Sequence, residues 1–95
     1  MLLIAGHAGV DPDDRDEAVA VMRDRVTRAR DAPGRLDLAI TTASVDPTRI
    51  NYFERWESQS AVDSFRASGP SDDQRAAMLS ASVAEYDVAD VRTLL

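Results

Sequence analysis

The sequence lacks several features on which common protein functions depend. It has no cysteine, so disulfide bonds and thiolate metal sites are excluded, and the redox compartment stays open. No apolar run approaches the roughly 18–20 residues that a membrane-spanning helix needs. The apolar start over residues 1–5 is short and has no basic flank, which does not fit a signal peptide. We therefore expect a cytoplasmic protein that has no membrane partner.

Basic charge and generic catalytic motifs are also scarce. Seventeen Asp and Glu residues against eleven Lys and Arg residues give a net charge of −6, which repels phosphate backbones, so nucleic acid is not an expected partner. There is no Gly-rich phosphate loop and no paired His and Glu motif for a metal. His7 is the only histidine, and the carboxylates are scattered over predicted helix surfaces. The sequence therefore predicts no metal site.

What is present fits one folded domain. The chain has 95 residues and a hydrophobic fraction of 44%, so we expect a single domain over residues 1–95. A domain of this size buries only about 60–65% of the surface that its unfolded chain exposes, which leaves a lone copy marginally stable.

The periodicity of apolar residues predicts the secondary structure. Asp11 and Pro12 suit the first positions of a helix, and Pro33-Gly34 ends it. Leu36, Leu38 and Ile40 alternate with more polar residues, which is typical of a strand with one buried face. The predicted elements are a strand over 2–10, a helix over 12–30, an antiparallel hairpin of strands around 36–41 and 49–56, a helix begun by Ser58 or Ser60 and running through Phe65, a helix begun by Ser71 and running to 79, and a strand over 83–94. This order, β-α-β-β-α-α-β, predicts an α+β ferredoxin-like sheet with its helices on one face.

Such a sheet leaves its other face bare. On the second hairpin strand Tyr52, Glu54 and Trp56 share one face, whereas Phe53 and Arg55 share the other. A bare face that carries a large aromatic side chain marks an interface or a binding groove. We therefore expect a homodimer in which two such faces meet. The alternative is that Trp56 simply packs under the helix that follows it.

The segment from Asn51 to Ser58 carries a family resemblance. Its Tyr-x-Glu-x-Trp-Glu-Ser pattern, followed by a short helix over 60–65, is similar to the antibiotic biosynthesis monooxygenase family. The helix over 12–30, Gly34 and the Asp46-Pro47 turn resemble that family as well, so the likeness covers nearly the whole chain, although only the region of Trp56 is distinctive. The resemblance implies a dimeric α+β barrel with a cleft between sheet and helices in each subunit.

The resemblance also implies two kinds of activity. Some relatives oxidise phenolic or hydroquinone-type molecules with molecular oxygen and without a metal or organic cofactor. Others degrade haem and use a histidine on the last helix as the iron ligand. Here residues 69–74 contain no histidine, which disfavours haem degradation. We therefore expect a cofactor-independent monooxygenase that acts on a small aromatic molecule, with a non-catalytic ligand-binding or accessory module of the same fold as the alternative.

The resemblance places Trp56 and Tyr52 in the cleft, and His7 where haem-degrading relatives carry an asparagine. We expect His7 to accept the phenolic proton, Tyr52 to donate to the oxyanion and Trp56 to stack on the substrate ring. A structural role for His7, as a partly buried histidine bonded to backbone or solvent, stays open.

Four further residues are candidates for binding the substrate. Arg66 is a possible donor to the oxyanion. Glu54 either binds Arg55 or Arg66 of the partner subunit or forms a structural ion pair. Phe65 and Met78 either line the helix side of the cleft or belong to an ordinary core.

Overall fold

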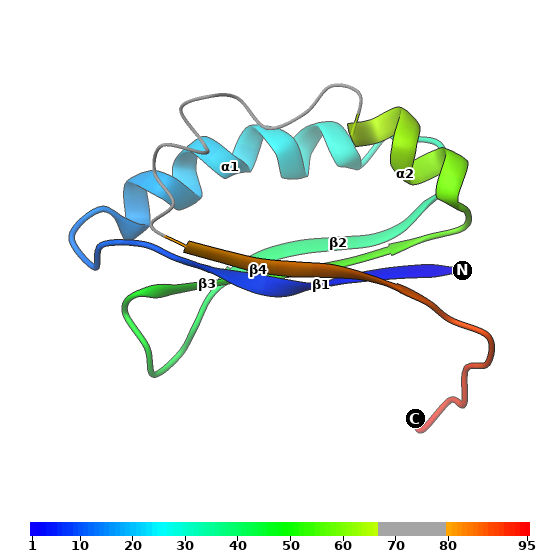
Figure 1. Ribbon diagram of the computed structural model, residues 1–95. Coiled ribbons are helices and arrows are strands. Elements are labelled where there is room, and N and C mark those ends of the chain that lie inside the picture. The colour runs from blue at the N-terminus through cyan, green and yellow to red at the C-terminus, as the bar shows by residue number, and fades with distance from the viewer. Residues whose placement is uncertain (67–79) are drawn as a thin grey trace.

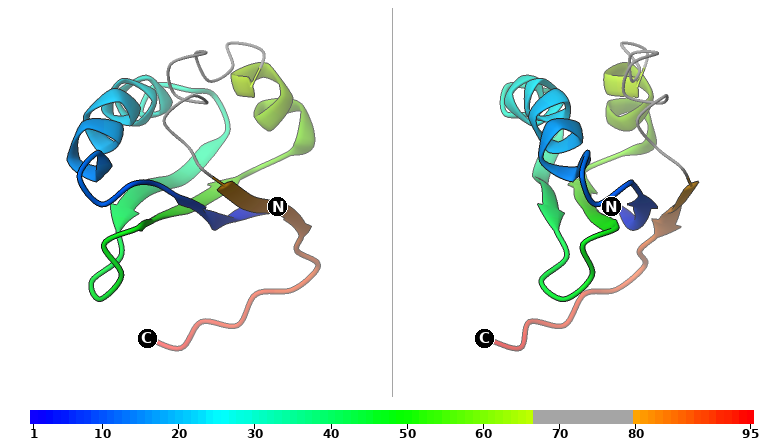
Figure 2. Two further views of the ribbon diagram at one scale, coloured as in Figure 1. Left: turned by 60° about the vertical axis from the view of Figure 1, so that its left-hand side comes forward. Right: turned by 90° about the vertical axis from the view of Figure 1, so that its left-hand side faces the viewer.

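A computed structural model describes residues 1–66 and 80–95. Its four strands form one antiparallel sheet in the order β2-β3-β1-β4, and both helices lie on the same side of that sheet (Figures 1 and 2). The elements are β1 (Leu2–Gly9), α1 (Arg15–Ala29), β2 (Arg35–Thr42), β3 (Arg49–Trp56), α2 (Gln59–Arg66) and β4 (Ser80–Asp87). The expected α+β, ferredoxin-like fold is confirmed. The helix expected over 71–79 lies outside the described residues.

Helix α1 begins three residues later than the sequence suggested. Asp11 does not cap the helix: its Oδ1 accepts a hydrogen bond of 2.9 Å from the backbone N–H of Asp13, which closes a turn before the helix. The helix cap is Asp14, whose side chain makes no capping hydrogen bond. At the other end Gly34 takes a φ of +81°, which a glycine adopts without strain, and so turns the chain into β2.

The hairpin of β2 and β3 forms as predicted, with one irregularity. Arg35 pairs with Trp56 and Asp37 with Arg55, so Leu36 is the extra residue of a β-bulge. The bulge leaves Leu36 41% exposed, although its alternation with Leu38 and Ile40 predicted that it shares their buried face. Leu38 and Ile40 do pack against the core under the helices.

The pairing of β1 with β3 sorts the sheet into two surfaces. Ile4 lies opposite Glu54, and Leu2 lies opposite Trp56; the surface that carries them, which we call the helix face, packs against α1 and α2. The opposite surface, which we call the open face, carries Phe53 and the odd-numbered residues of β1. In the part of the chain that the structure describes, two hydrophobic clusters lie between the helix face and the helices, one around Trp56 and one around Ile50.

Strand β4 ends earlier than predicted, at Asp87 and not near residue 94. Its pairing with β1 begins with Leu2 opposite Asp87, so β4 loses its partner where β1 starts. Residues 88–95 then lead away on the side of the sheet opposite the helices (Figure 2). At the middle of this ladder a Cβ on Gly6 would lie 2.6 Å from Val83 Cα, so the two strands meet this closely because residue 6 is glycine.

Candidate functional site

Strand β3 delivers three of the expected site residues to the helix face. Because side chains alternate along a strand, Tyr52, Glu54 and Trp56 all point toward the helices, as their spacing indicated. Trp56 is 0% exposed and is sealed into the interior, whereas Glu54 is buried but keeps 4% of its surface exposed. A carboxylate and an indole N–H in such a place need partners, because an unpaired buried polar group is destabilising.

Glu54 and Trp56 satisfy each other. The indole Nε1 of Trp56 donates a hydrogen bond of 3.0 Å to Glu54 Oε1. The indole ring lies 5.1 Å from the ring of Phe65 on α2, centroid to centroid and tilted by 37°, within the range of favourable aromatic pairs. Trp56 therefore fixes one oxygen of a buried carboxylate and anchors α2 to the sheet.

Tyr52 occupies the next position on the same face. Its hydroxyl donates to Met22 Sδ on α1 at 3.1 Å. Burial raises the pKa of Tyr52 to about 12; the nearby Glu54 adds to this rise, and Arg25 opposes it. The phenol therefore stays protonated at neutral pH and acts as a hydrogen-bond donor.

A residue that the sequence did not single out completes the cluster. Arg25 lies on α1 among the buried positions of that helix and is only 9% exposed. Its guanidinium carbon lies 4.9 Å from the centroid of the Phe65 ring, a cation–π arrangement. The signal in the sequence was its spacing, three residues after Met22 and four before Ala29, which puts an arginine in the middle of an apolar stripe.

His7 is not part of this cluster. It pairs with Asn51 on β3 and with Ser82 on β4, so it shares the open face with them, whereas Tyr52 and Trp56 lie on the helix face. The expectation that His7 and Trp56 meet in one cleft is therefore wrong, because the odd and even positions of a strand point to opposite sides of the sheet. Only the pairing register of the two strands determines whether the odd or the even residues of β1 lie on the same face as Tyr52 and Trp56 of β3.

The structure places the other expected residues as follows. Trp56 is fully buried in the core, so no face of its ring is open for stacking on a substrate. Phe65 is buried in the same core, and Arg66 ends α2 with its side chain exposed. Burial lowers the pKa of Arg25 and the positive charge of Arg66 lowers it further, so the two side chains interact electrostatically. Met78 lies outside the described residues.

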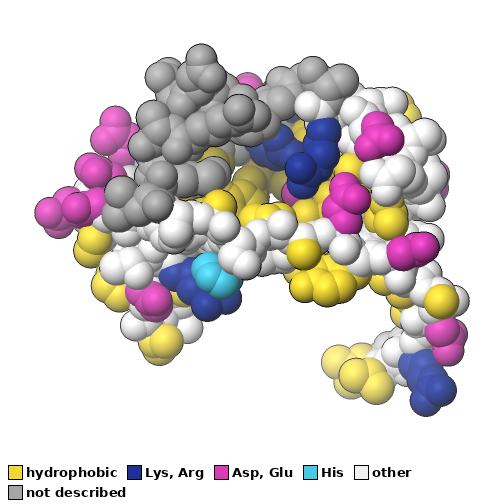
Figure 3. Space-filling view, in the orientation of Figure 1, with side chains coloured by type: hydrophobic (Ala, Val, Ile, Leu, Met, Phe, Trp, Pro, Cys, Tyr) yellow, Lys and Arg dark blue, Asp and Glu magenta, His cyan; other side chains and the backbone are white. Residues whose placement is uncertain are grey.

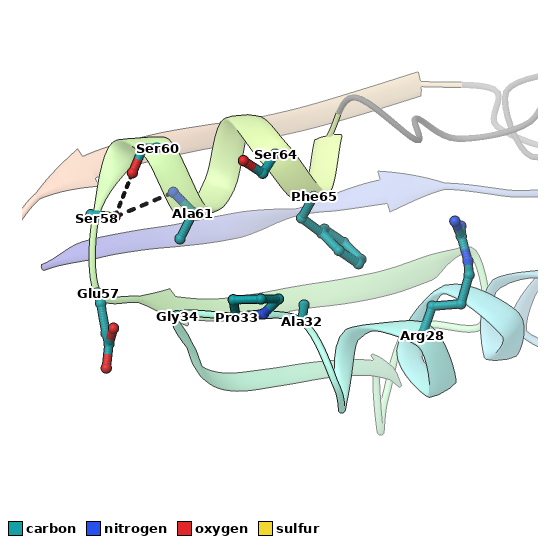
Figure 4. Close-up of a pocket in the computed structure, with 10 residues that line it drawn as sticks. All are labelled: Arg28, Ala32, Pro33, Gly34, Glu57, Ser58, Ser60, Ala61, Ser64 and Phe65. Atoms are coloured by element: carbon teal, nitrogen blue, oxygen red, sulfur yellow. Dashed lines mark hydrogen bonds between the residues drawn. The ribbon is translucent and has the colours of Figure 1, made fainter.

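A hollow of about 560 Å³ opens beside the cluster (Figure 4). It lies between the end of α1, the turn into β2 and the start of α2, with Arg28 and Phe65 near one end and Glu57 at the other. Ser58 Oγ accepts a hydrogen bond of 3.2 Å from the backbone N–H of Ala61 at this edge, which confirms the expected start of α2. Tyr52, Glu54 and Trp56 do not line this hollow.

The space-filling view shows the molecule recessed between sheet and helices, with hydrophobic, acidic and basic side chains meeting in the recess (Figure 3). The basic side chains are all arginine, because the chain has no lysine. Within residues 1–66 and 80–95, no three His, Cys, Asp or Glu side chains gather closely enough to hold a metal ion. Over the same part of the chain no helix has the length and apolar character needed to cross a membrane.

Comparison with known proteins gives the same architecture. A family model described as antibiotic biosynthesis monooxygenase matches residues 1–78. A protein from Nitrosomonas europaea, provisionally named an antibiotic biosynthesis monooxygenase, superposes with a TM-score of 0.81 at 17% identity, covering 95% of this chain and 100% of its own. Rv0793 from Mycobacterium tuberculosis superposes with a TM-score of 0.79 at 22% identity, covering 97% and 98% of the two chains.

No curated protein matches the sequence. The structural likenesses are distant in sequence and establish the fold, whereas the family model covers most of the chain itself. The chain therefore belongs to the antibiotic biosynthesis monooxygenase family.

Proposed function

We propose that this protein is a cofactor-independent monooxygenase that oxidises a small phenolic or hydroquinone-type molecule between its sheet and its helices. The observation that supports the proposal is the buried cluster on the helix face, in which Glu54 is held by Trp56 beside the protonated phenol of Tyr52. Buried, mutually oriented titratable groups of this kind are typical of reactive sites.

The proposed chemistry needs a proton acceptor and a stabiliser of negative charge. In the simplest balanced case, a phenol with a free para C–H reacts with O₂ to give a p-quinone and water. One oxygen atom forms the new carbonyl, and the other leaves as water with the two hydrogens that the substrate loses. The phenol supplies all four electrons that O₂ accepts, so no separate reductant is required.

Roles for the residues follow from their placement on the helix face. Glu54 takes over the role expected of His7: its carboxylate accepts the phenolic proton, while the hydrogen bond from Trp56 keeps it oriented. Tyr52 donates to the developing oxyanion after its hydroxyl turns away from Met22 Sδ, and its high pKa keeps the hydroxyl protonated. Trp56 acts as a positioning residue in this scheme, because it is sealed from any ligand.

Oxygen uptake tests the proposed activity. Incubation with a panel of phenols and hydroquinones, without added metal or flavin, is expected to consume one O₂ for each quinone formed from a phenol and one O₂ for each hydroxyquinone formed from a hydroquinone. Water, and not hydrogen peroxide, is the expected second product in both cases. Uptake that Glu54→Gln leaves unchanged for every compound argues against the assignment, and so does the absence of any turnover.

The hollow between α1 and α2 supports a second candidate function. Its lining includes Phe65, Arg28 and Glu57 but none of the proposed catalytic groups, which favours a non-catalytic module that binds a small molecule there. Thermal stabilisation by a phenol without any product would support this alternative over the oxygenase.

We further propose that the working form is a homodimer joined through the open faces. Phe53 is 39% and Tyr86 52% exposed in the single chain. Phe53 lies opposite Ala5 of β1, and Tyr86 lies opposite Leu3, so their side chains form one apolar surface with that strand. A second copy that covers this surface would remove it from water.

A further inference from the structure

Arg25 is buried beyond what its partners explain. The residue is 9% exposed, yet its side chain makes no hydrogen bond and no ion pair within the described part of the chain. Its one defined contact is the face of the Phe65 ring, which offers the guanidinium no acceptor. Arginine carries five N–H donors, and a buried charge is stable only when it is paired.

The nitrogens of Arg25 are not sealed off from open space. Over residues 1–66 and 80–95, the single polar side-chain atom that is both enclosed and unpaired is Nε of Arg35. The unpaired nitrogens of Arg25 are therefore not fully enclosed. Arg25 is not itself among the residues that line the hollow, but Phe65, over whose ring Arg25 lies, is.

The positive charges around Arg25 outnumber the negative ones, which favours the binding of an anion. Burial lowers the pKa of Arg25, with Arg66 and Arg28 adding to the shift and Glu54 opposing it. Of these neighbours Arg28 has a carboxylate of its own, Asp24, at 3.1 Å. Arg25 and Arg66 are then balanced only by the single negative charge of Glu54. In the described residues no ion pair joins Glu54 to either arginine, so its carboxylate lies more than 4 Å from both guanidinium groups.

We propose that Arg25 binds the carboxylate of the ligand, so that the preferred substrate is a phenol that also carries a carboxylic acid. This inference rests on the proposed function, since it concerns the same cluster. The planar guanidinium fork matches a planar carboxylate through two parallel hydrogen bonds. A singly charged group fits better than a dianionic phosphate, because the buried carboxylate of Glu54 shares the site and repels added negative charge. The ring of such a ligand lies against Phe65.

A matched pair of probes tests the inference by binding alone. 3-Hydroxybenzoate and 3-hydroxybenzamide both keep the free para C–H that the proposed reaction needs and differ in one substituent, a carboxylate against a neutral carboxamide of similar shape. Calorimetric titration under nitrogen measures the binding of both without turnover. The wild-type protein is expected to bind the acid at least about tenfold more tightly than the amide, as a charge-assisted hydrogen-bonded pair implies. Equal affinities for the two probes, or binding of neither, overturn the inference.

Variants assign the preference to one residue. Arg25→Met is expected to abolish the preference for the acid, and Arg25→Lys to retain part of it. Arg23→Met, on the exposed side of the same helix, is expected to keep all of it. If the preference survives in Arg25→Met, or if inorganic phosphate displaces the acid with equal affinity, the assignment is wrong. The comparison of the two probes on the wild-type protein needs no variant to fold.

The outcome separates this inference from the proposed activity. Tight, Arg25-dependent binding of the acid without oxygen uptake by any phenol leaves the anion site standing and removes the oxygenase. Oxidation of neutral and acidic phenols at equal efficiency keeps the oxygenase and removes the anion site.

Discussion

The two faces of this sheet use the same strands for different purposes. On the helix face the polar groups of β3 are buried with defined partners, as in the hydrogen bond between Trp56 and Glu54. On the open face the polar residue His7 is only half-buried and has strand neighbours, Asn51 and Ser82, that are short and neutral. The comparison indicates that the buried carboxylate of Glu54 marks the candidate site, because a charged group in the interior is stable only where its surroundings hold it.

The largest expected difference between the faces is in activity. Glu54→Gln keeps the shape and the hydrogen bond from Trp56 but removes the proton acceptor. We expect the rate of oxygen uptake to fall by about 10²–10⁴-fold, the usual contribution of a general base. Glu17→Gln, exposed on α1 and away from the hollow, is the matched control and should act like the wild type. A fall of less than threefold in Glu54→Gln contradicts the role given to Glu54.

The next effect concerns stability on the helix face. Trp56→Ala removes the largest fully buried side chain and leaves Glu54 Oε1 without its donor. The free energy of unfolding should fall by about 3–5 kcal/mol, as it does for buried aromatic residues generally. Urea unfolding at one fixed protein concentration measures it, with Val45→Ala in the exposed hairpin turn as a control expected within about 0.5 kcal/mol. A loss below about 1 kcal/mol would show that the core around Trp56 is loosely packed.

A charged substitution on the open face tests the proposed dimer interface. Phe53→Arg would bury an unpaired guanidinium in the proposed interface, so the dimer dissociation constant should rise at least about tenfold. Light scattering over a dilution series measures it, and Val45→Arg on the exposed turn serves as the control. A wild-type protein that is monomeric throughout the series removes the dimer proposal.

The raised pKa of Tyr52 makes the stability of the protein depend on pH in the alkaline range. The folded-state pKa of Tyr52 is about 12, above its ordinary value of 10. Below pH 10 this residue is protonated in both states; between pH 10 and 12 the unfolded chain loses the proton first, so stability decreases as pH rises through that window. Absorbance at 295 nm should show an ionisation step near pH 12 in the folded protein, and Tyr52→Phe should remove it. Absence of such a step, or its survival in Tyr52→Phe, contradicts the burial of Tyr52.

The smallest expected effect belongs to His7. Since it lies across the sheet from Tyr52 and Glu54, His7→Asn should change the rate of oxygen uptake by less than about twofold. The pH dependence of the rate near neutrality should also be unchanged. A loss of activity comparable with that of Glu54→Gln would return His7 to the site.

The sequence predicted the parts of the fold that depend on local pattern. Ser58, one of the two serines expected to begin α2, does so, and the parity of Tyr52, Glu54 and Trp56 places them on one face, since both follow from short-range rules. Helix α1 ends at Ala29, a few residues before the expected stop at Pro33-Gly34. The bulge at Leu36 was missed because no local signal marks an extra residue in a strand.

The two errors in the site have a common physical cause. Strand pairing decides whether the odd or the even residues of β1 share a face with Tyr52 and Trp56. The side of the sheet on which His7 lies could therefore not be deduced from residues near it in the sequence. Arg25 stood in an apolar stripe, but a long arginine on a helix often extends past its neighbours to water. Only the packing of Phe65 over it, forty residues later in the chain, shows that this guanidinium turns inward.

The position of β1 has a consequence for how the chain folds. β1 comes first in the chain but lies between β3 and β4, so its two sides are paired by segments that are some 50 and 80 residues distant. Until residues 80–87 arrive, one edge of β1 carries unpaired backbone groups next to an apolar surface. Such distant pairing slows folding and gives intermediates an adhesive edge. Proteolytic removal of the C-terminal strand should therefore cause aggregation, and not simply yield a smaller domain.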